Sequence, residues 1–244
     1  MPPVLIAAGL SLLGGLGGLL CASALLLLPP GTRARVVPPL VSYAVGALLG
    51  AALMALLPEA LERRPAPVVF GTLLGGILAF FVLEKLVLWR HCHSEGCDVH
   101  GASAPLILMG DAVHNFVDGA MIGAAVLTSV PLGVTTAIAV AAHEVPQEIG
   151  DFAVLLHAGY SRRRALGLNV LCALTSVAGA VGAVALATQL PEVLPYLLAL
   201  AAASFLYVAL SDLVPGLHGR GQSGLAALRQ VLLIGLGMAT ILAL

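Results

Sequence analysis

Residues Ala141–His157 read AAHEVPQEIGDFAVLLH, and they lie inside an otherwise apolar stretch, 132–158, that is long enough to cross a membrane. The segment contains two His, two Glu and one Asp, but no Lys or Arg. The preceding apolar stretch carries a second polar segment, Asp111–Gly119 (DAVHNFVDG). Ionisable side chains are rare inside a bilayer, and they usually mark an ion path or a binding site. We therefore expect the functional site of the chain to be formed by these two segments.

The composition is that of an all-α integral membrane protein. Of the 244 residues, 60% are hydrophobic and only 9% are charged, whereas soluble domains carry about 25% charged residues. A helical span needs about 20 apolar residues, which predicts a single transmembrane domain, 1–244, with eight spans at 3–28, 38–58, 67–90, 105–127, 132–158, 163–189, 192–214 and 224–244. The net charge of −1 offers no basic surface for nucleic acid, so the lipid bilayer is the expected partner.

The distribution of Lys and Arg predicts the orientation. The odd-numbered connections and their flanks hold nine of the eleven basic residues, whereas the fourth and sixth connections hold none. By the positive-inside rule the odd connections are cytoplasmic and both termini face outside, as in a multi-pass protein of the plasma or inner membrane. Pairs such as Gly14/Gly18, Gly46/Gly50, Gly71/Gly75 and Gly119/Gly123 indicate close helix packing. They do not separate packing within one chain from a homodimer.

The two central histidines are predicted to lie at the same depth. His114 is nine residues from Pro105, or about 14 Å along a helix, and His143 is eleven residues from Leu132, or about 16 Å. The hydrocarbon core is about 30 Å thick. Both side chains are therefore expected near the middle of the membrane, on adjacent antiparallel helices.

The spacing of the polar residues predicts shared helix faces. His114 and Asp118 are four residues apart, as are His143 and Gln147, and residues four apart are neighbours on a helix surface. Imidazole nitrogens and carboxylate oxygens together suit zinc and other first-row metals. The two helices hold no Lys or Arg. They hold five carboxylates, namely Asp111, Asp118, Glu144, Glu148 and Asp151. Protons or metal cations must neutralise this charge.

The motifs themselves resemble those of a known family. His114–Gly119 (HNFVDG) and His143–Phe152 (HEVPQEIGDF) are similar to the signatures of ZIP-family metal transporters, as is the layout of eight spans with both termini outside. Two further segments, 57–59 (LPE) and 210–215 (LSDLVP), also look family-like. The resemblance implies a 3+2+3 bundle, in which helices 1–3 and 6–8 form an inverted repeat around helices 4 and 5.

The resemblance also implies a binuclear metal site halfway along the pathway. His114, Asp118, His143 and Gln147 would surround one metal. Asn115, Asp118 and Glu144 would surround the second, with Asp118 bridging and Glu148 close by. The family moves Zn(II), and in some members Fe(II), Mn(II) or Cd(II), toward the cytoplasm, and alternating access is the expected mechanism. Two departures are Gln147, where many relatives have His or Glu, and Thr175, where some have a carboxylate.

Weaker signals extend the predicted pathway. Glu59 lies at the outer end of the second span, and Asp212 lies toward the cytoplasmic end of the seventh. Asp111, Asp151 and His157 lie on the cytoplasmic side of the predicted ligands, although His157 also suits an interfacial position. The connection after the third span holds five candidate metal ligands, namely His91, Cys92, His93, Cys97 and His100. A weak cytoplasmic metal-acceptor loop and an ordinary polar loop explain these residues equally well.

Two other functions compete with transport. An intramembrane zinc metalloprotease would use H-E-x-x-H, but here Gln147 occupies the position of the second His. A proton channel or a non-transporting metal sensor is a further alternative. The sequence favours a transporter of divalent metal ions, most of all zinc, over an enzyme.

Overall fold

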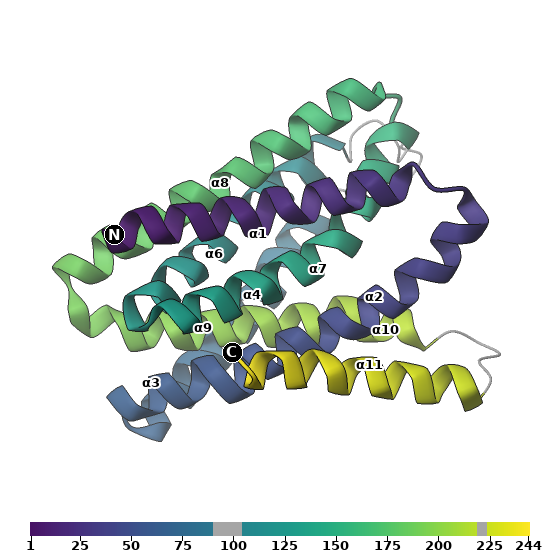
Figure 1. Cartoon of the computed structure of the whole chain (residues 1–244). Helices are drawn as coiled ribbons and strands as arrows, with labels where there is room; N and C mark the ends of the chain where they lie inside the picture. The colour runs from purple at the N-terminus through teal and green to yellow at the C-terminus, as the bar shows by residue number, and fades with distance from the viewer. Residues whose placement is uncertain (90–103, 219–223) are drawn as a thin grey trace.

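The computed structural model describes residues 1–89, 104–218 and 224–244, and within these residues every regular element is a helix (Figure 1). The helices are α1 (Pro3–Leu26), α2 (Pro30–Gly50), η1 (Ala51–Leu56), α3 (Leu57–Arg63), α4 (Ala66–Trp89), α6 (Ala104–Thr128), α7 (Val130–His157), α8 (Arg162–Gln189), η2 (Pro191–Val193), α9 (Leu194–Tyr207), η3 (Val208–Leu213), α10 (Val214–Leu217) and α11 (Gly224–Leu242). Because the short helices continue α2 and α9, the described residues form eight long helical stretches. The predicted all-α fold is confirmed.

Proline and serine mark the first residues of several helices. Pro3 and Pro30 occupy the first positions of α1 and α2, where a missing amide hydrogen costs nothing. At α7 the Ser129 side chain accepts a hydrogen bond from the amide of Leu132. At α8 Ser161 does the same for Arg164. Such caps satisfy amide groups that a helix start leaves without partners.

The second stretch is longer than the sequence predicts. The predicted span starts at residue 38, but α2 starts at Pro30 and carries Pro38 and Pro39 inside the helix. Each internal proline frees a carbonyl four residues earlier, here at Ala34 and Arg35. Both of these residues are exposed, so solvent or lipid headgroups can bond the freed oxygens. The prolines are therefore tolerated where the sequence suggests a boundary.

The helix pairing follows an inverted repeat. α2, the second long stretch, packs against α11, the eighth. The corresponding helices of the other half, α9 (the seventh stretch) and α4 (the third), also pack against each other. In the same way α1 packs on α7, and α8 packs on α6. Two six-residue π-helical segments, η1 and η3, occupy matching places in α2–α3 and α9–α10, and each precedes a proline, Pro58 or Pro215. The 3+2+3 arrangement places α6 and α7 between the repeats.

Glycines set the closest helix contacts. A Cβ at Gly119 would overlap the carbonyl of Ser176, and one at Gly46 would overlap the carbonyl of Ile234. Gly18 faces the Glu144 side chain, so α1 lies directly over the polar part of α7. The Gly71/Gly75 pair differs from the packing that the sequence predicts, since a Cβ at either position would meet no atom within 4 Å.

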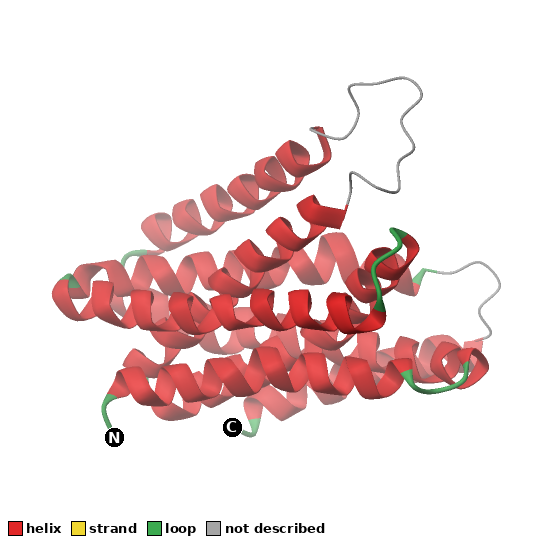
Figure 2. Cartoon of the chain, turned by 90° about the horizontal axis from the view of Figure 1, so that it is seen from above, coloured by secondary structure: helices red, strands yellow, loops and turns green. Residues whose placement is uncertain are grey.

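The helices lie side by side, and both termini are at the end of the bundle opposite the α1–α2 connection (Figures 1 and 2). Among the described residues, six stretches are long and apolar enough to cross a membrane by length and composition: Pro3–Leu26, Pro30–Arg63, Ala66–Leu83, Arg162–Gln189, Pro191–Leu217 and Gly224–Leu242. α6 and α7 are not among these six. They are the helices that carry the polar segments, and α1, α2, α8 and α9 pack against one or both of them.

Candidate metal centre

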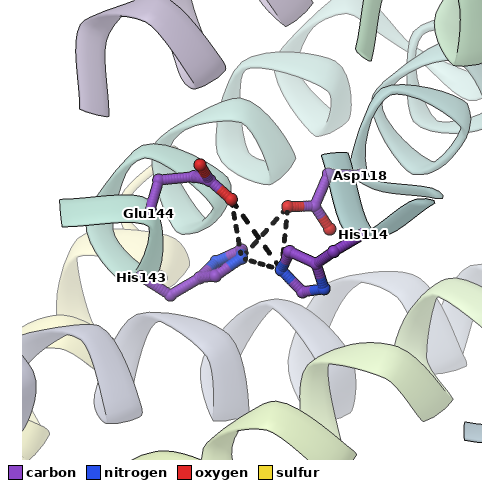
Figure 3. A group of neighbouring side chains, drawn as sticks. All are labelled: His114, Asp118, His143 and Glu144. Atoms are coloured by element: carbon purple, nitrogen blue, oxygen red, sulfur yellow. Dashed lines mark hydrogen bonds and ion pairs between the residues drawn. The ribbon is translucent and has the colours of Figure 1, made fainter. Parts of the chain in front are cut away.

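Four side chains from α6 and α7 point toward one another at the centre of the bundle (Figure 3). His114 and Asp118 come from α6, and His143 and Glu144 come from α7. Each offers one ligand atom, and these four atoms all lie within 4.8 Å of one another. Asp118, His143 and Glu144 are buried, whereas the His114 side chain remains 19% exposed.

The spacing of the four atoms suits a tetrahedral metal. The Nε2 atoms of His114 and His143 are 3.1 Å apart. Asp118 Oδ2 lies 3.0 Å from His143 Nε2 and 3.5 Å from His114 Nε2. Glu144 Oε1 lies 3.8 Å from each imidazole. Ligands held at about 2.0–2.1 Å around a tetrahedral zinc ion lie about 3.3 Å from one another, so these five separations of 3.0–3.8 Å are close to those around such an ion.

Backbone contacts orient the second imidazole. His143 Nδ1 lies 3.0 Å from the carbonyl oxygen of Ala139. A carbonyl can only accept, so Nδ1 carries a proton, and in the neutral form of the ring the lone pair of Nε2 faces the other three ligand atoms. The Phe205 ring meets the His143 ring edge-on at 6.1 Å and packs beside it.

The carboxylates of the cluster lack donors. Neither oxygen of Asp118 or Glu144 accepts a hydrogen bond from the described residues. A buried carboxylate without a donor is costly, and two of them facing an imidazole lone pair repel one another. A cation at their centre would remove this repulsion.

A second polar group lies beside the cluster. The Asn115 amide donates to Asp111 Oδ1 at 2.9 Å and to the Asp111 carbonyl at 3.2 Å, which leaves Asn115 Oδ1 without a donor among the described residues. Glu148 Oε2 accepts from the amide of Asn169 on α8 at 2.7 Å. Asn169 is fully buried. Sequence reasoning missed it, although a lone Asn within an apolar span is the signal that could have found it.

The remaining candidates lie at varied places. Gln147 is half-buried one turn after His143, and Asp151 is half-buried one turn further. The Thr175 hydroxyl donates to the carbonyl oxygens of Ala112 and Cys172, both at 2.7 Å. Its proton is therefore engaged by backbone groups of α6 and α8. Glu59 forms an ion pair with Arg63 at 2.7 Å near the surface.

His157 and Asp212 are exposed, at the end of α7 and in η3 respectively. The five loop candidates His91, Cys92, His93, Cys97 and His100 lie outside the described residues.

Comparison with known proteins identifies the family of the chain. Residues 90–244, more than half of the chain, match the sequence profile described as ZIP zinc transporter. The chain belongs to the ZIP zinc transporter family. As a ZIP family member with six strongly apolar helical stretches, it is a multi-pass integral membrane protein. Its relatives are named as transporters and not as enzymes.

Named relatives from animals share the matched region. The chain is 50% identical to human zinc transporter ZIP4 over 112 residues, which cover 46% of this chain and 17% of ZIP4. It is 39% identical to human zinc transporter ZIP10 over 166 residues, or 62% of this chain and 20% of ZIP10. Drosophila melanogaster zinc transporter foi is 39% identical over 145 residues, or 59% of this chain and 20% of foi. The matched regions thus span a fifth or less of these ZIP relatives.

Proposed function

We propose that the protein carries divalent metal ions across a membrane, with zinc as its main substrate. The observation that carries this proposal is the set of two imidazole nitrogens and two carboxylate oxygens from α6 and α7, all within 4.8 Å of one another. Two nitrogen and two oxygen ligands suit zinc, and they also accept Fe(II), Mn(II) or Cd(II). The zinc transporter names of the relatives support the same substrate.

The charge of the site explains why a cation binds there. Asp118 and Glu144 contribute two negative charges, which one divalent ion neutralises. A metal ion that leaves water loses its hydration shell, so several ligands must replace the water molecules together. Because the four ligand atoms are gathered around one point, they can do this without large movement.

A second metal beside the first is part of the proposal. Asn115 Oδ1 has no donor among the described residues and can act as a neutral ligand. Asp118 would bridge the two ions through its two oxygens, with Glu144 as a further ligand and Glu148 close by. Gln147 would complete the first ion's surroundings as a weak, neutral ligand.

The proposed direction of transport is toward the cytoplasm, by alternating access. Asp111 and Asp151 lie on the side of the ligands that the positive-inside rule assigns to the cytoplasm, so they would receive the ion as it leaves, with His157 and Asp212 further along. The burial of Asp118, His143 and Glu144 fits a carrier better than an open channel. On the outer side the ion pair with Arg63 lowers the attraction of Glu59 for cations. The outward position of both termini, a plasma or inner membrane location and a homodimer stay predictions.

Uptake of radiolabelled zinc into proteoliposomes tests the proposal. The wild-type protein should accumulate zinc well above protein-free liposomes, and Glu144→Gln should transport far less. The matched control is Thr136→Val, which changes a buried polar residue of the same helix whose hydroxyl, within the part of the chain that the structure describes, bonds only the Leu132 carbonyl. Zinc binding without uptake by the wild type would indicate a sensor, and uptake of protons alone would indicate a channel.

A further inference from the structure

A pocket of about 260 Å³ lies where α1 ends and where α2 and α8 begin. Figure 1 shows these three helix ends at the same end of the bundle. The walls of the pocket come from four helices, because the last turns of α7 also line it. The lining residues are Ser23, Leu26, Leu27, Arg33, Phe152, Leu156, Arg162, Arg163 and Leu166. The excess of Lys and Arg in the odd connections places this end on the cytoplasmic side of the membrane.

Three arginines make the pocket strongly positive. Among the described residues, no acidic side chain forms an ion pair with Arg33, Arg162 or Arg163. Arg162 and Arg163 lie in the first turn of α8, which contains no acidic residue. The start of a helix already carries partial positive charge, so the arginines add to a field of the same sign. An anion held here would relieve the repulsion between the arginines and the positive helix start.

The rest of the pocket is apolar. Leu26, Leu27, Leu156 and Leu166 line it, and Phe152, which also lines it, belongs to a small buried cluster with Leu155 and Ala165. The Ser23 hydroxyl also lines the pocket, is buried, and has no hydrogen-bond partner among the described residues. The pocket therefore offers a guanidinium group on each of two elements, a hydroxyl and a hydrocarbon wall.

We propose that this pocket binds an anionic phospholipid, with the headgroup phosphate between Arg33 and the first turn of α8 and an acyl chain along the leucines. Guanidinium groups hold phosphate oxygens through paired, charge-assisted hydrogen bonds. Basic pockets between transmembrane helices on the cytoplasmic side suit anionic headgroups. A free phosphate would not use the apolar wall, so the lipid fits the whole lining. The inference goes beyond the proposed transport and does not depend on it.

Native mass spectrometry of the detergent-solubilised protein, titrated with lipid, tests the proposal. The probes are phosphatidylglycerol, phosphatidylcholine and inorganic phosphate at equal concentrations. We expect the wild type to retain phosphatidylglycerol in preference to the other two probes. In the double variant Arg33→Gln/Arg162→Gln, the apparent affinity for phosphatidylglycerol should fall about tenfold or more.

The matched control is Arg35→Gln/Arg164→Gln. It removes two arginines from the same two helices, but neither of them lines the pocket. The control should bind phosphatidylglycerol as the wild type does. An equal loss in both variants would overturn the proposal in favour of general attraction to a basic surface. Equal binding of phosphatidylcholine would show that charge does not select the ligand, and equal binding of inorganic phosphate would indicate an anion site without a lipid.

Discussion

Replacing Asp118 with Ala removes the proposed ligand whose carboxylate lies closest to both histidines. Asp118 Oδ2 is 3.0 Å from His143 Nε2 and 3.5 Å from His114 Nε2. Zinc binding to structural sites is worth about 10–16 kcal/mol, so each of four ligands contributes about 3–4 kcal/mol. Loss of one such share weakens zinc binding by about 10²–10³-fold, since about 1.4 kcal/mol corresponds to a factor of ten. Asp118→Ala should therefore bind zinc at least about a hundredfold more weakly than the wild type.

Thermal unfolding with added zinc measures this change. Zinc at a hundred times the wild-type dissociation constant stabilises the wild type by about 2.7 kcal/mol, and at the same concentration it should stabilise Asp118→Ala by about 0.4 kcal/mol or less. Without zinc the variant should unfold at nearly the wild-type temperature, because losing a buried carboxylate that has no donor among the described residues offsets the cavity. Thr136→Val should keep the full response to zinc. A response of wild-type size in Asp118→Ala would refute the assignment of Asp118 as a ligand.

Further predictions concern a neighbouring ligand, protons and helix packing. Gln147→His should tighten zinc binding by about tenfold, because imidazole is a stronger zinc ligand than a neutral amide; calorimetry with unchanged affinity would place residue 147 outside the site. Zinc uptake should fall steeply as the pH drops from about 6.5 to 5, because protons compete with the metal for imidazole and carboxylate groups. A rate that stays flat from about pH 8 to 5 would contradict this competition. Gly119→Ala should lower the free energy of unfolding by about 1–3 kcal/mol, because the new Cβ overlaps the Ser176 carbonyl. Gly110→Ala, on the same helix with no atom within 4 Å of the new Cβ, should leave it unchanged or raise it by up to about 1 kcal/mol in a chemical unfolding assay, because Ala is the better helix former.

The helical layout could be predicted from the sequence because hydrophobic length is a strong local signal. α8 spans Arg162–Gln189 against a predicted 163–189, and α7 ends at His157, one residue before the predicted end. α2 was the exception, since Pro38 and Pro39 usually mark a boundary but lie here inside a helix. Whether a freed carbonyl finds another partner depends on its exposure, which the local sequence does not report.

Spacing and depth could bring together three of the four central side chains. His114 and Asp118 are four residues apart on one helix, and His143 lies at the matching depth on its neighbour. Glu144 entered the predicted ligand set through the resemblance to the ZIP family, which assigned it to the second metal. The partners from other helices could not be predicted in this way. The bond from Asn169 to Glu148 and the contact of Gly18 with Glu144 depend on how α8 and α1 pack against the central pair. Helix periodicity says which residues share a face, but it does not say which helix covers that face.

The central claim is that a divalent ion binds among two imidazoles and two carboxylates contributed by α6 and α7. Anomalous diffraction at the zinc edge, from crystals of the zinc-loaded protein, tests it most directly. The account predicts a strong peak within about 2.0–2.2 Å of His114 Nε2, His143 Nε2 and one oxygen each of Asp118 and Glu144. Zinc peaks found only elsewhere in the molecule, with none among these four side chains, would contradict it.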